Sequence, residues 1–97
     1  MGIILEKEVA LTLKNLQDKR MAGKLLAGIR EIRDRGLTAS NIKRLGHIKN
    51  GYRKRVGRYR ILFTAEADRQ VIHIWIIEIK KDPRDYYKWI KRIGRNL

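Results

Sequence analysis

The stretch Lys49–Phe63 reads KNGYRKRVGRYRILF, and it predicts two β-strands joined by a tight turn. With Gly57 and Arg58 as the turn residues, glycine takes the first position of a type II′ turn, which matches the twist of hairpin strands. This register places Arg55 opposite Arg60. Like charges directly opposite each other in a ladder are destabilising. We therefore expect the hairpin to hold these arginines for an anionic partner.

Side chains alternate between the two faces of a strand, so the hairpin has one basic face and one apolar face. The basic face carries Arg53, Arg55 and Arg60. The apolar face collects Tyr52, Val56, Tyr59, Ile61 and Phe63. We expect the apolar face to pack on the core, and its two tyrosines to be core residues rather than platforms for bases.

The composition describes a folded, strongly basic chain. Of its 97 residues 43% are hydrophobic, and 24 Lys and Arg against 10 Asp and Glu give a formal net charge of +14. A clustered charge of this size favours a polyanionic partner: nucleic acid first, then an acidic protein, then an anionic membrane. We expect residues 1–97 to form a single domain.

The residue content also excludes several kinds of site. There is no cysteine, which excludes a disulfide framework and a thiolate metal site, and two histidines argue against structural zinc. The apolar start Ile3–Leu5 is far shorter than the core of a secretory signal, and nothing later is long enough to span a bilayer. We expect a cytoplasmic protein with no metal, no cofactor and no membrane partner.

The first half of the chain predicts a short strand and two helices. Ile3–Leu5 reads as a strand buried on both faces. Apolar residues at helical spacing then predict one helix over Val9–Leu16 and a second over Ala22–Ile32, which Gly36 ends. The two helices are expected to form an antiparallel pair. The segment Asn41–Leu45 predicts a helical turn or an irregular approach to the hairpin.

The second half adds a strand and a helix to the hairpin. Val71–Ile79 is almost continuously apolar, which is typical of a central strand covered on both faces, with His73 as a core histidine and Glu78 as a charge partner of the basic face. Asp82 followed by Pro83 predicts the start of a C-terminal helix. The sequence therefore predicts an α+β fold: a short strand and a two-helix hairpin packed on an antiparallel-rich sheet of three to four strands, with a C-terminal helix.

Basic residues gather in two stretches that border this sheet. Asn41–Arg60 contains eight basic residues and no acidic one, and a second stretch follows the last strand. Phosphate contacts of this kind supply affinity but little sequence information. Besides the three hairpin arginines, we expect RNA contacts from Lys43, Arg44, Lys49, Lys54, Arg58, Arg84 and Tyr86.

The basic face can support metal-independent cleavage of RNA, in which a 2′-OH attacks the adjacent phosphate. The chain lacks a glycine-rich phosphate loop, a nucleophile elbow and an HExxH motif. Arginine keeps its charge and presents a planar fork to phosphate, so the hairpin arginines suit stabilisation of the transition state. The proton-transfer group stays open among Tyr87, Tyr86, His47, Lys54 and Lys81.

The chain resembles the RelE/ParE superfamily of small toxins from bacterial and archaeal toxin–antitoxin pairs. The resemblance is most specific in KRLG at Lys43–Gly46, GYRKRVGRYRILF at Gly51–Phe63 and DYY at Asp85–Tyr87. In the RNA-cleaving branch, two basic residues in the first hairpin strand, an arginine in the next strand and a C-terminal tyrosine serve the site. The resemblance places these catalytic roles on Arg53, Arg55, Arg60 and Tyr87. Family members often carry a further arginine just after the last strand, for which Lys81 and Arg84 are the nearest candidates, and Lys81 is included in the catalytic set.

The resemblance implies a toxin that cleaves mRNA, in association with the ribosome, and that rests in complex with an acidic antitoxin. A ParE-like member, which poisons DNA gyrase and cuts no RNA, shares the fold and often lacks the catalytic set. A basic RNA-binding module without toxicity is the third interpretation. The three hairpin arginines together with Tyr87 favour the ribonuclease over the gyrase inhibitor.

Overall fold

The secondary structure of the protein confirms the predicted α+β class. The structure is a computed structural model, and it describes residues 2–46, 48–66 and 70–79. The elements follow one another as β1 (Gly2–Leu5), α1 (Lys7–Asn15), α2 (Lys19–Arg35), the short 3-10 helix η1 (Gly36–Thr38), β2 (Ile42–Arg44), β3 (Gly51–Val56), β4 (Tyr59–Glu66) and β5 (Val71–Ile79). The predicted C-terminal helix after Asp82 lies outside the described residues.

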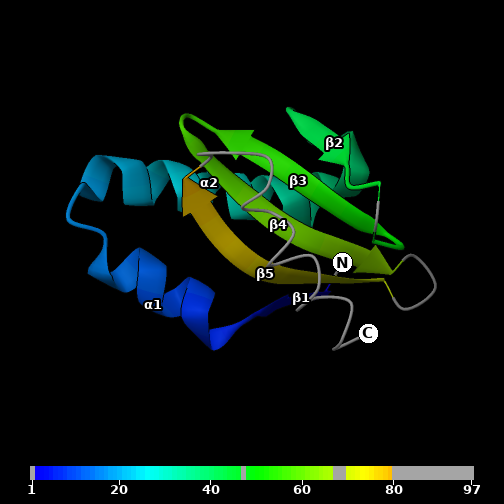
Figure 1. Cartoon of the computed structure of the whole chain (residues 1–97), viewed down its shortest axis with the longest axis horizontal. Coiled ribbons are helices and arrows are strands. Elements are labelled where there is room, and N and C mark those ends of the chain that lie inside the picture. The colour runs from blue at the N-terminus through cyan, green and yellow to red at the C-terminus, as the bar shows by residue number, and fades with distance from the viewer. Residues whose placement is uncertain (1, 47, 67–69, 80–97) are drawn as a thin grey trace.

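Five strands form one sheet in the order β1-β5-β4-β3-β2 (Figure 1). β1 pairs with β5 in parallel, and the other three pairings are antiparallel. The prediction of three to four strands is therefore too low. The strand it misses is β2, in the segment Asn41–Leu45 where the sequence predicts a helical turn or an irregular approach. β2 is three residues long and mostly charged, so pairing with β3 rather than any apolar pattern makes it a strand.

The two helices cover one face of the sheet and run in opposite directions, as predicted (Figure 1). Asp18 caps the start of α2 by accepting a hydrogen bond from the Met21 N–H at 3.0 Å. Gly36 ends this helix with a φ of 57°, a conformation that glycine adopts at little cost. The core between helices and sheet is built from Val9, Leu25, Ile29, Ile32, Tyr59, Ile61, Phe63, Ala65, Ile72, Ile74 and Ile77.

β1 occupies an edge of the sheet, and this corrects one prediction. Ile4 is 50% exposed and Leu5 41%, so the segment Ile3–Leu5 is not buried on both faces. An apolar run indicates a strand, but it does not say whether that strand lies inside the sheet. The position comes from the parallel pairing with β5, since β5 is the strand with which β1 pairs among the strands that the structure describes.

β5 carries an irregularity that decides which of its side chains share a face with the arginines. Leu62 pairs with Ile76 whereas Phe63 pairs with Ile74, so Trp75 is an extra residue in the ladder. The extra residue reverses the alternation of the strand beyond it. As a result Glu78 lies opposite Arg60.

The second face of the sheet has a smaller core of its own. It consists of Leu45, Ile48, Leu62, Trp75 and Ile76. β5 thus contributes buried side chains to both cores, which confirms the prediction for Val71–Ile79. The middle strand of the sheet is β4, whose residues Tyr59–Ala65 are all buried.

Candidate nucleic-acid interface

The β3–β4 hairpin has the predicted register, with Arg55 opposite Arg60. Gly57 has a φ of 61°, and Arg58 is not among the residues with positive φ, which is the combination of a type II′ turn. The hairpin tyrosines lie on the core side, as predicted. Tyr59 is buried in the core, and the ring of Tyr52 stacks on that of Phe63 with centroids 5.8 Å apart.

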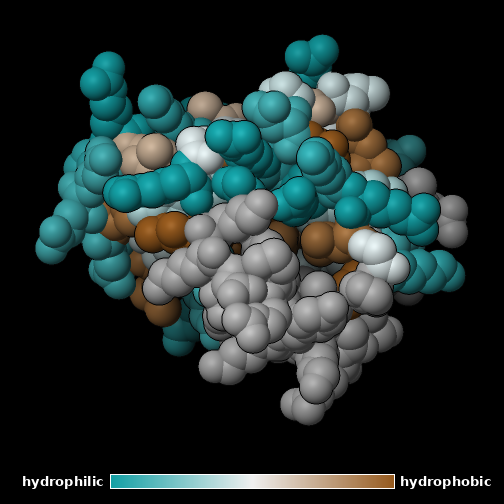
Figure 2. Space-filling model, turned by 45° about the horizontal axis from the view of Figure 1, so that its top comes forward, coloured by the Kyte–Doolittle hydropathy of each residue, from teal (hydrophilic) through white to brown (hydrophobic). Residues whose placement is uncertain are grey.

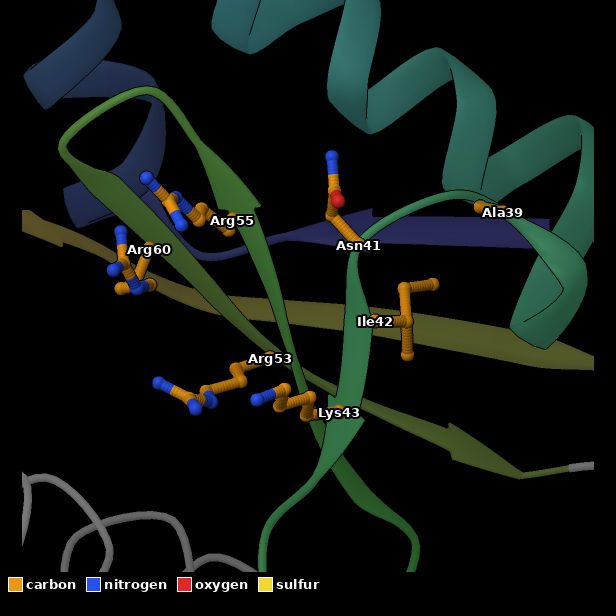
Figure 3. Close-up of a pocket in the computed structure, with 7 residues that line it drawn as sticks. All are labelled: Ala39, Asn41, Ile42, Lys43, Arg53, Arg55 and Arg60. Atoms are coloured by element: carbon orange, nitrogen blue, oxygen red, sulfur yellow. The ribbon is translucent and has the colours of Figure 1, made fainter.

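The three hairpin arginines line one pocket of about 340 Å³ on the face opposite the helices (Figure 3). Figure 3 shows Arg55 and Arg60 side by side near the hairpin turn, with Arg53 and Lys43 farther along β3 and β2. Among the residues that the structure describes, the lining consists of Ala39, Asn41, Ile42, Lys43, Arg53, Arg55 and Arg60. The basic face that the sequence predicts is therefore the wall of a concave site.

One backbone carbonyl orients the two arginines that face each other across the ladder. Gly57 O accepts from Arg55 Nε at 3.4 Å and from Arg60 Nη1 at 3.3 Å. Arg60 Nη1 also donates to Tyr59 O at 3.0 Å. A carbonyl oxygen carries only a partial charge, so it holds both guanidinium groups without neutralising them. On the other side of β4, Glu78 is the ladder partner of Arg60, in keeping with its predicted role.

Arg53 and Lys43 form the second basic pair of the pocket. They lie opposite each other in the β2–β3 ladder. Within residues 2–46, 48–66 and 70–79, neither side chain makes a hydrogen bond or an ion pair. Their donors are therefore open to a ligand such as a phosphate group, which arginine binds through two parallel hydrogen bonds.

The lining determines what the pocket can do chemically. The lining that the structure describes offers three guanidinium groups and one ammonium group, and none of these seven described residues carries a carboxylate, an imidazole or a phenol. Such a site binds an anion and stabilises negative charge that develops in a reaction. Arginine stays protonated throughout the physiological pH range, so these three residues do not transfer protons.

Lys54 is not part of this site, which corrects its prediction as an RNA-binding residue and as a proton-transfer candidate there. It lies between Arg53 and Arg55 but points to the helix face, where it is only 3% exposed. Its Nζ is 2.9 Å from Glu31 Oε1. Lys54 pairs with Ile61 in the β3–β4 ladder, so the alternation of the strand places its side chain on the apolar face.

Lys54 is buried in this ion pair, whereas its partner Glu31 is partly exposed. Hydrogen bonds from Lys54 and from Ser40 lower the pKa of Glu31 from 4.5 to about 2. The Glu31 carboxylate therefore stays charged at any pH near neutrality.

The remaining predicted RNA-binding residues are distributed around the pocket. Lys49 and Arg58 are exposed, and Arg58 lies 6.0 Å from the centre of the Tyr59 ring. Arg44 is exposed but lies opposite Tyr52, so it points away from the face of Lys43. Figure 2 shows hydrophilic side chains over much of this side of the molecule. Five predicted residues lie outside the described part of the chain: His47, Lys81, Arg84, Tyr86 and Tyr87.

Asn41 is a pocket residue that the sequence reasoning missed. It has a φ of 60°, and its carbonyl accepts the Arg55 N–H at 3.1 Å. Asparagine adopts this left-handed conformation more readily than most residues, so an asparagine just before a basic run is the only signal that was available. His73 also differs from the prediction: it is partly exposed and bonds Glu6 Oε1 at 2.6 Å while stacking on Trp75.

Two negative findings apply to the part of the chain that the structure describes. No group of three His, Asp or Glu side chains there is arranged to hold a metal ion. None of its helices is long and apolar enough to cross a membrane.

Comparison with known proteins identifies the fold. No protein-family model and no curated protein sequence matches the chain. Among solved structures, the RelB–RelE antitoxin–toxin complex of Methanococcus jannaschii matches with a TM-score of 0.68 and 24% identity, over 87% of this chain and 98% of that one. A mutant of the E. coli toxin RelE in the free state matches with a TM-score of 0.72 and 14% identity, over 95% and 96%. A YoeB/ParE toxin from Agrobacterium tumefaciens matches with a TM-score of 0.69 and 14% identity, over 84% and 100%. The chain therefore has the fold of the RelE-type toxins.

Proposed function

We propose that this protein is the toxin of a toxin–antitoxin pair, and that it acts as a metal-independent endoribonuclease on mRNA. One observation carries the proposal: Arg53, Arg55 and Arg60 line a single pocket on a RelE-type fold. Solved structures with this fold are described as toxins or as toxin–antitoxin complexes. The net charge of +14 fits a nucleic-acid substrate.

The arginine pocket would bind the scissile phosphate and stabilise its transition state. In the reaction, a base removes the proton of the 2′-OH, and the 2′ oxygen attacks the adjacent phosphorus. The bond to the 5′ oxygen then breaks, and an acid protonates this leaving group to give a 2′,3′-cyclic phosphate and a 5′-OH. Charge on the phosphate oxygens grows during the attack, and preoriented guanidinium groups stabilise it without reorganising.

The proton-transfer groups have to come from elsewhere, because the three arginines keep their protons. Tyr87 and Lys81 are the candidates we retain from the sequence. Arg84 and Tyr86 are retained as RNA-binding residues of the same segment. Both a phenol and an amine can act as general acid or base once their environment tunes the pKa.

The proposed resting partner is an acidic antitoxin. Several solved structures with this fold are complexes of RelE with RelB, so the fold is compatible with such an assembly. An acidic partner would compensate the net charge of +14 and restrain the toxin. The test is co-purification with the product of an adjacent short acidic reading frame; the absence of such a gene would favour a plain RNA-binding module.

Primer extension on mRNA in a translating extract tests the nuclease directly. Wild-type protein should produce discrete cleavage, and Arg60→Ala and Tyr87→Phe should reduce it by about a hundredfold or more. Translation-free RNA in parallel reactions tests whether cleavage depends on the ribosome. The double variant Arg20→Ala/Arg30→Ala, on the exposed side of α2, controls for loss of positive charge. Full cleavage by Arg60→Ala would remove the hairpin from the site.

A gyrase inhibitor is the second candidate, because a toxin described as YoeB/ParE shares the fold. The lining of the pocket is also consistent with it, since none of the seven described residues carries a carboxylate, an imidazole or a phenol. Growth arrest with intact mRNA and trapped gyrase–DNA complexes would establish this candidate and overturn the ribonuclease.

A further inference from the structure

A closed polar cluster joins α2, β3 and the segment before β2 on the face opposite the arginines. Lys54 Nζ donates to Glu31 Oε1 at 2.9 Å, to Ser40 O at 2.6 Å and to Ser40 Oγ at 3.3 Å. These acceptors match the three protons of an ammonium group. Glu31 in turn accepts from the Ser40 N–H at 3.3 Å and from Ser40 Oγ at 2.8 Å. Each member of the cluster therefore holds the other two.

The helix approaches β3 closely enough for the lysine to reach this cluster. A Cβ at Gly28 would lie 3.0 Å from Val56 Cγ2 and 3.3 Å from Lys54 Cε. The absence of a side chain at Gly28 lets the lysine stem pass beside α2 to Glu31, one turn farther along. The ammonium group ends nearly buried, and a buried charge is stable only when it is paired and hydrogen-bonded.

The cluster is connected to the arginine pocket through two short stretches of backbone. Ser40 lies between Ala39 and Asn41, which both line the pocket. The Asn41 carbonyl accepts the backbone N–H of Arg55 at 3.1 Å. Lys54 precedes Arg55, and alternation sends its side chain to one face and those of its neighbours to the other. Anchoring Lys54 and Ser40 thus fixes both the wall of the pocket and the strand that carries two of its arginines.

We propose that Lys54, Glu31 and Ser40 are positioning residues for the arginine pocket, which keep Arg53, Arg55 and the Asn41 wall in the geometry that binds RNA phosphate. None of the three touches the RNA. The inference rests on the proposed binding of phosphate by this pocket. The low pKa of Glu31, about 2, agrees with a carboxylate that is permanently engaged in this cluster.

Two variants on the same helix test the inference, because positioning and long-range electrostatics predict opposite changes in RNA affinity. Glu31→Gln and Asp34→Asn each remove one negative charge from α2, and Asp34 forms its ion pair with its exposed neighbour Arg33, at 2.9 Å. Long-range electrostatics alone predicts that both variants bind an anion as tightly as wild type or more tightly. If Glu31 positions the pocket, Glu31→Gln should bind RNA about tenfold more weakly. Losses of this size are typical when a residue that orients a binding side chain is changed.

The probe is a single-stranded RNA of about eight nucleotides, within the usual site size of single-strand binders. Its 2′ oxygens are methylated, which prevents cleavage during the measurement. Weaker binding by Glu31→Gln but not by Asp34→Asn supports the inference. Binding by Glu31→Gln that equals or exceeds that of Asp34→Asn overturns it. If Glu31→Gln does not fold, Ser40→Ala replaces it: this variant removes one hydroxyl at an exposed position, and unchanged affinity would overturn the inference.

A second readout needs no RNA and separates this inference from the proposed function. Hydrogen exchange of the Arg55 amide reports on its bond to the Asn41 carbonyl. Glu31→Gln should speed this exchange relative to the amide of Ile74, on β5, whose side chain is fully buried in the core. If wild type does not bind the probe, the proposed function fails, and exchange still decides on positioning. Unchanged protection of Arg55 would overturn it.

Discussion

β3 carries three consecutive cations, Arg53, Lys54 and Arg55, on two faces with opposite environments. Lys54 is 3% exposed and ion-paired with Glu31, whereas Arg55 is exposed and faces Arg60 across the ladder. All three side chains carry one positive charge, so charge alone does not distinguish their roles. A basic residue supports the fold where a carboxylate meets it in the interior. It is available to a ligand where, as for Arg55, the acceptor that the structure describes for its side chain is a backbone carbonyl oxygen.

The arginine face of the hairpin carries a repulsion between like charges that the helix face does not. Like charges opposite each other destabilise a ladder, and the carbonyl of Gly57 removes only part of that repulsion. A bound phosphate would remove the rest, so ligand binding should stabilise the fold. Four experiments test this contrast between the two faces, and they are ordered from the largest expected effect to the smallest.

Lys54→Met should destabilise the protein most, because it leaves Glu31 and Ser40 without their shared donor. Removal of one partner of a buried ion pair costs about 3–5 kcal/mol of stability. Because Glu31 is partly exposed, we expect a loss at the lower end of that range, about 3 kcal/mol. Urea denaturation measures the loss. Arg53→Met is the matched control on the other face and should change stability by less than about 0.5 kcal/mol. Equal losses in the two variants would erase the contrast between the faces.

The double variant Arg53→Ala/Arg55→Ala should show the reverse pattern, with near-normal stability and weak RNA binding. A hydrogen bond to a charged group contributes about 1.5–3 kcal/mol, so the pair of substitutions should weaken binding by about a hundredfold or more. The slope of log affinity against log salt should also fall by about one for each phosphate that the variant no longer neutralises. Arg20→Ala/Arg30→Ala removes the same charge outside the pocket. If this control loses as much affinity, net charge rather than the pocket binds RNA.

Gly57→Ala should disturb the arginine face through the turn. A non-glycine residue in this left-handed conformation costs about 1–2 kcal/mol, and the new Cβ would also lie 3.2 Å from Met21 Cε. Gly57→Asn should lose less, since asparagine tolerates positive φ better than alanine. Thermal unfolding compares the three proteins. A stability of Gly57→Ala equal to that of wild type would contradict the turn geometry.

Acid should remove the stability that the Glu31 carboxylate contributes on the helix face, over a defined pH range. The pKa of Glu31 is lower in the folded chain, about 2, than its ordinary value of 4.5. The carboxylate therefore adds stability above pH 4.5, and this contribution is lost as the pH falls toward 2. Because solvent screens this partly exposed carboxylate, we expect it to contribute about 1–2 kcal/mol to the free energy of unfolding. Urea denaturation of wild type and Glu31→Gln should differ at neutral pH and converge near pH 2. A constant difference would exclude Glu31 as the titrating group.

Local signals predicted much of the fold and the arginine side of the site. The turn at Gly57, the register that pairs Arg55 with Arg60, and the helix that Gly36 ends all rest on residues close together in the chain. Such features depend on backbone preferences and on alternation, which act over a few residues. The same alternation places Lys54 on the apolar face, although charge counting had assigned it to RNA.

Features that depend on distant residues were not predicted. β2 is a strand because β3 lies beside it, and β1 is exposed because it pairs at an edge. The extra residue at Trp75, which turns Glu78 toward Arg60, exists only in the pairing of β5 with β4. Periodicity within one segment contains no information about its neighbours in the sheet.

The α+β class and a hairpin whose three arginines share a face can be predicted from the amino-acid sequence, because strand alternation and turn chemistry are local properties. The folded structure is needed to show that those arginines form the wall of a pocket with Asn41 and Lys43, and that Lys54 lies in the interior. The role of each charged side chain depends on the groups packed around it. In this chain those groups, Glu31 and Ser40, come from a helix and a loop that precede the hairpin.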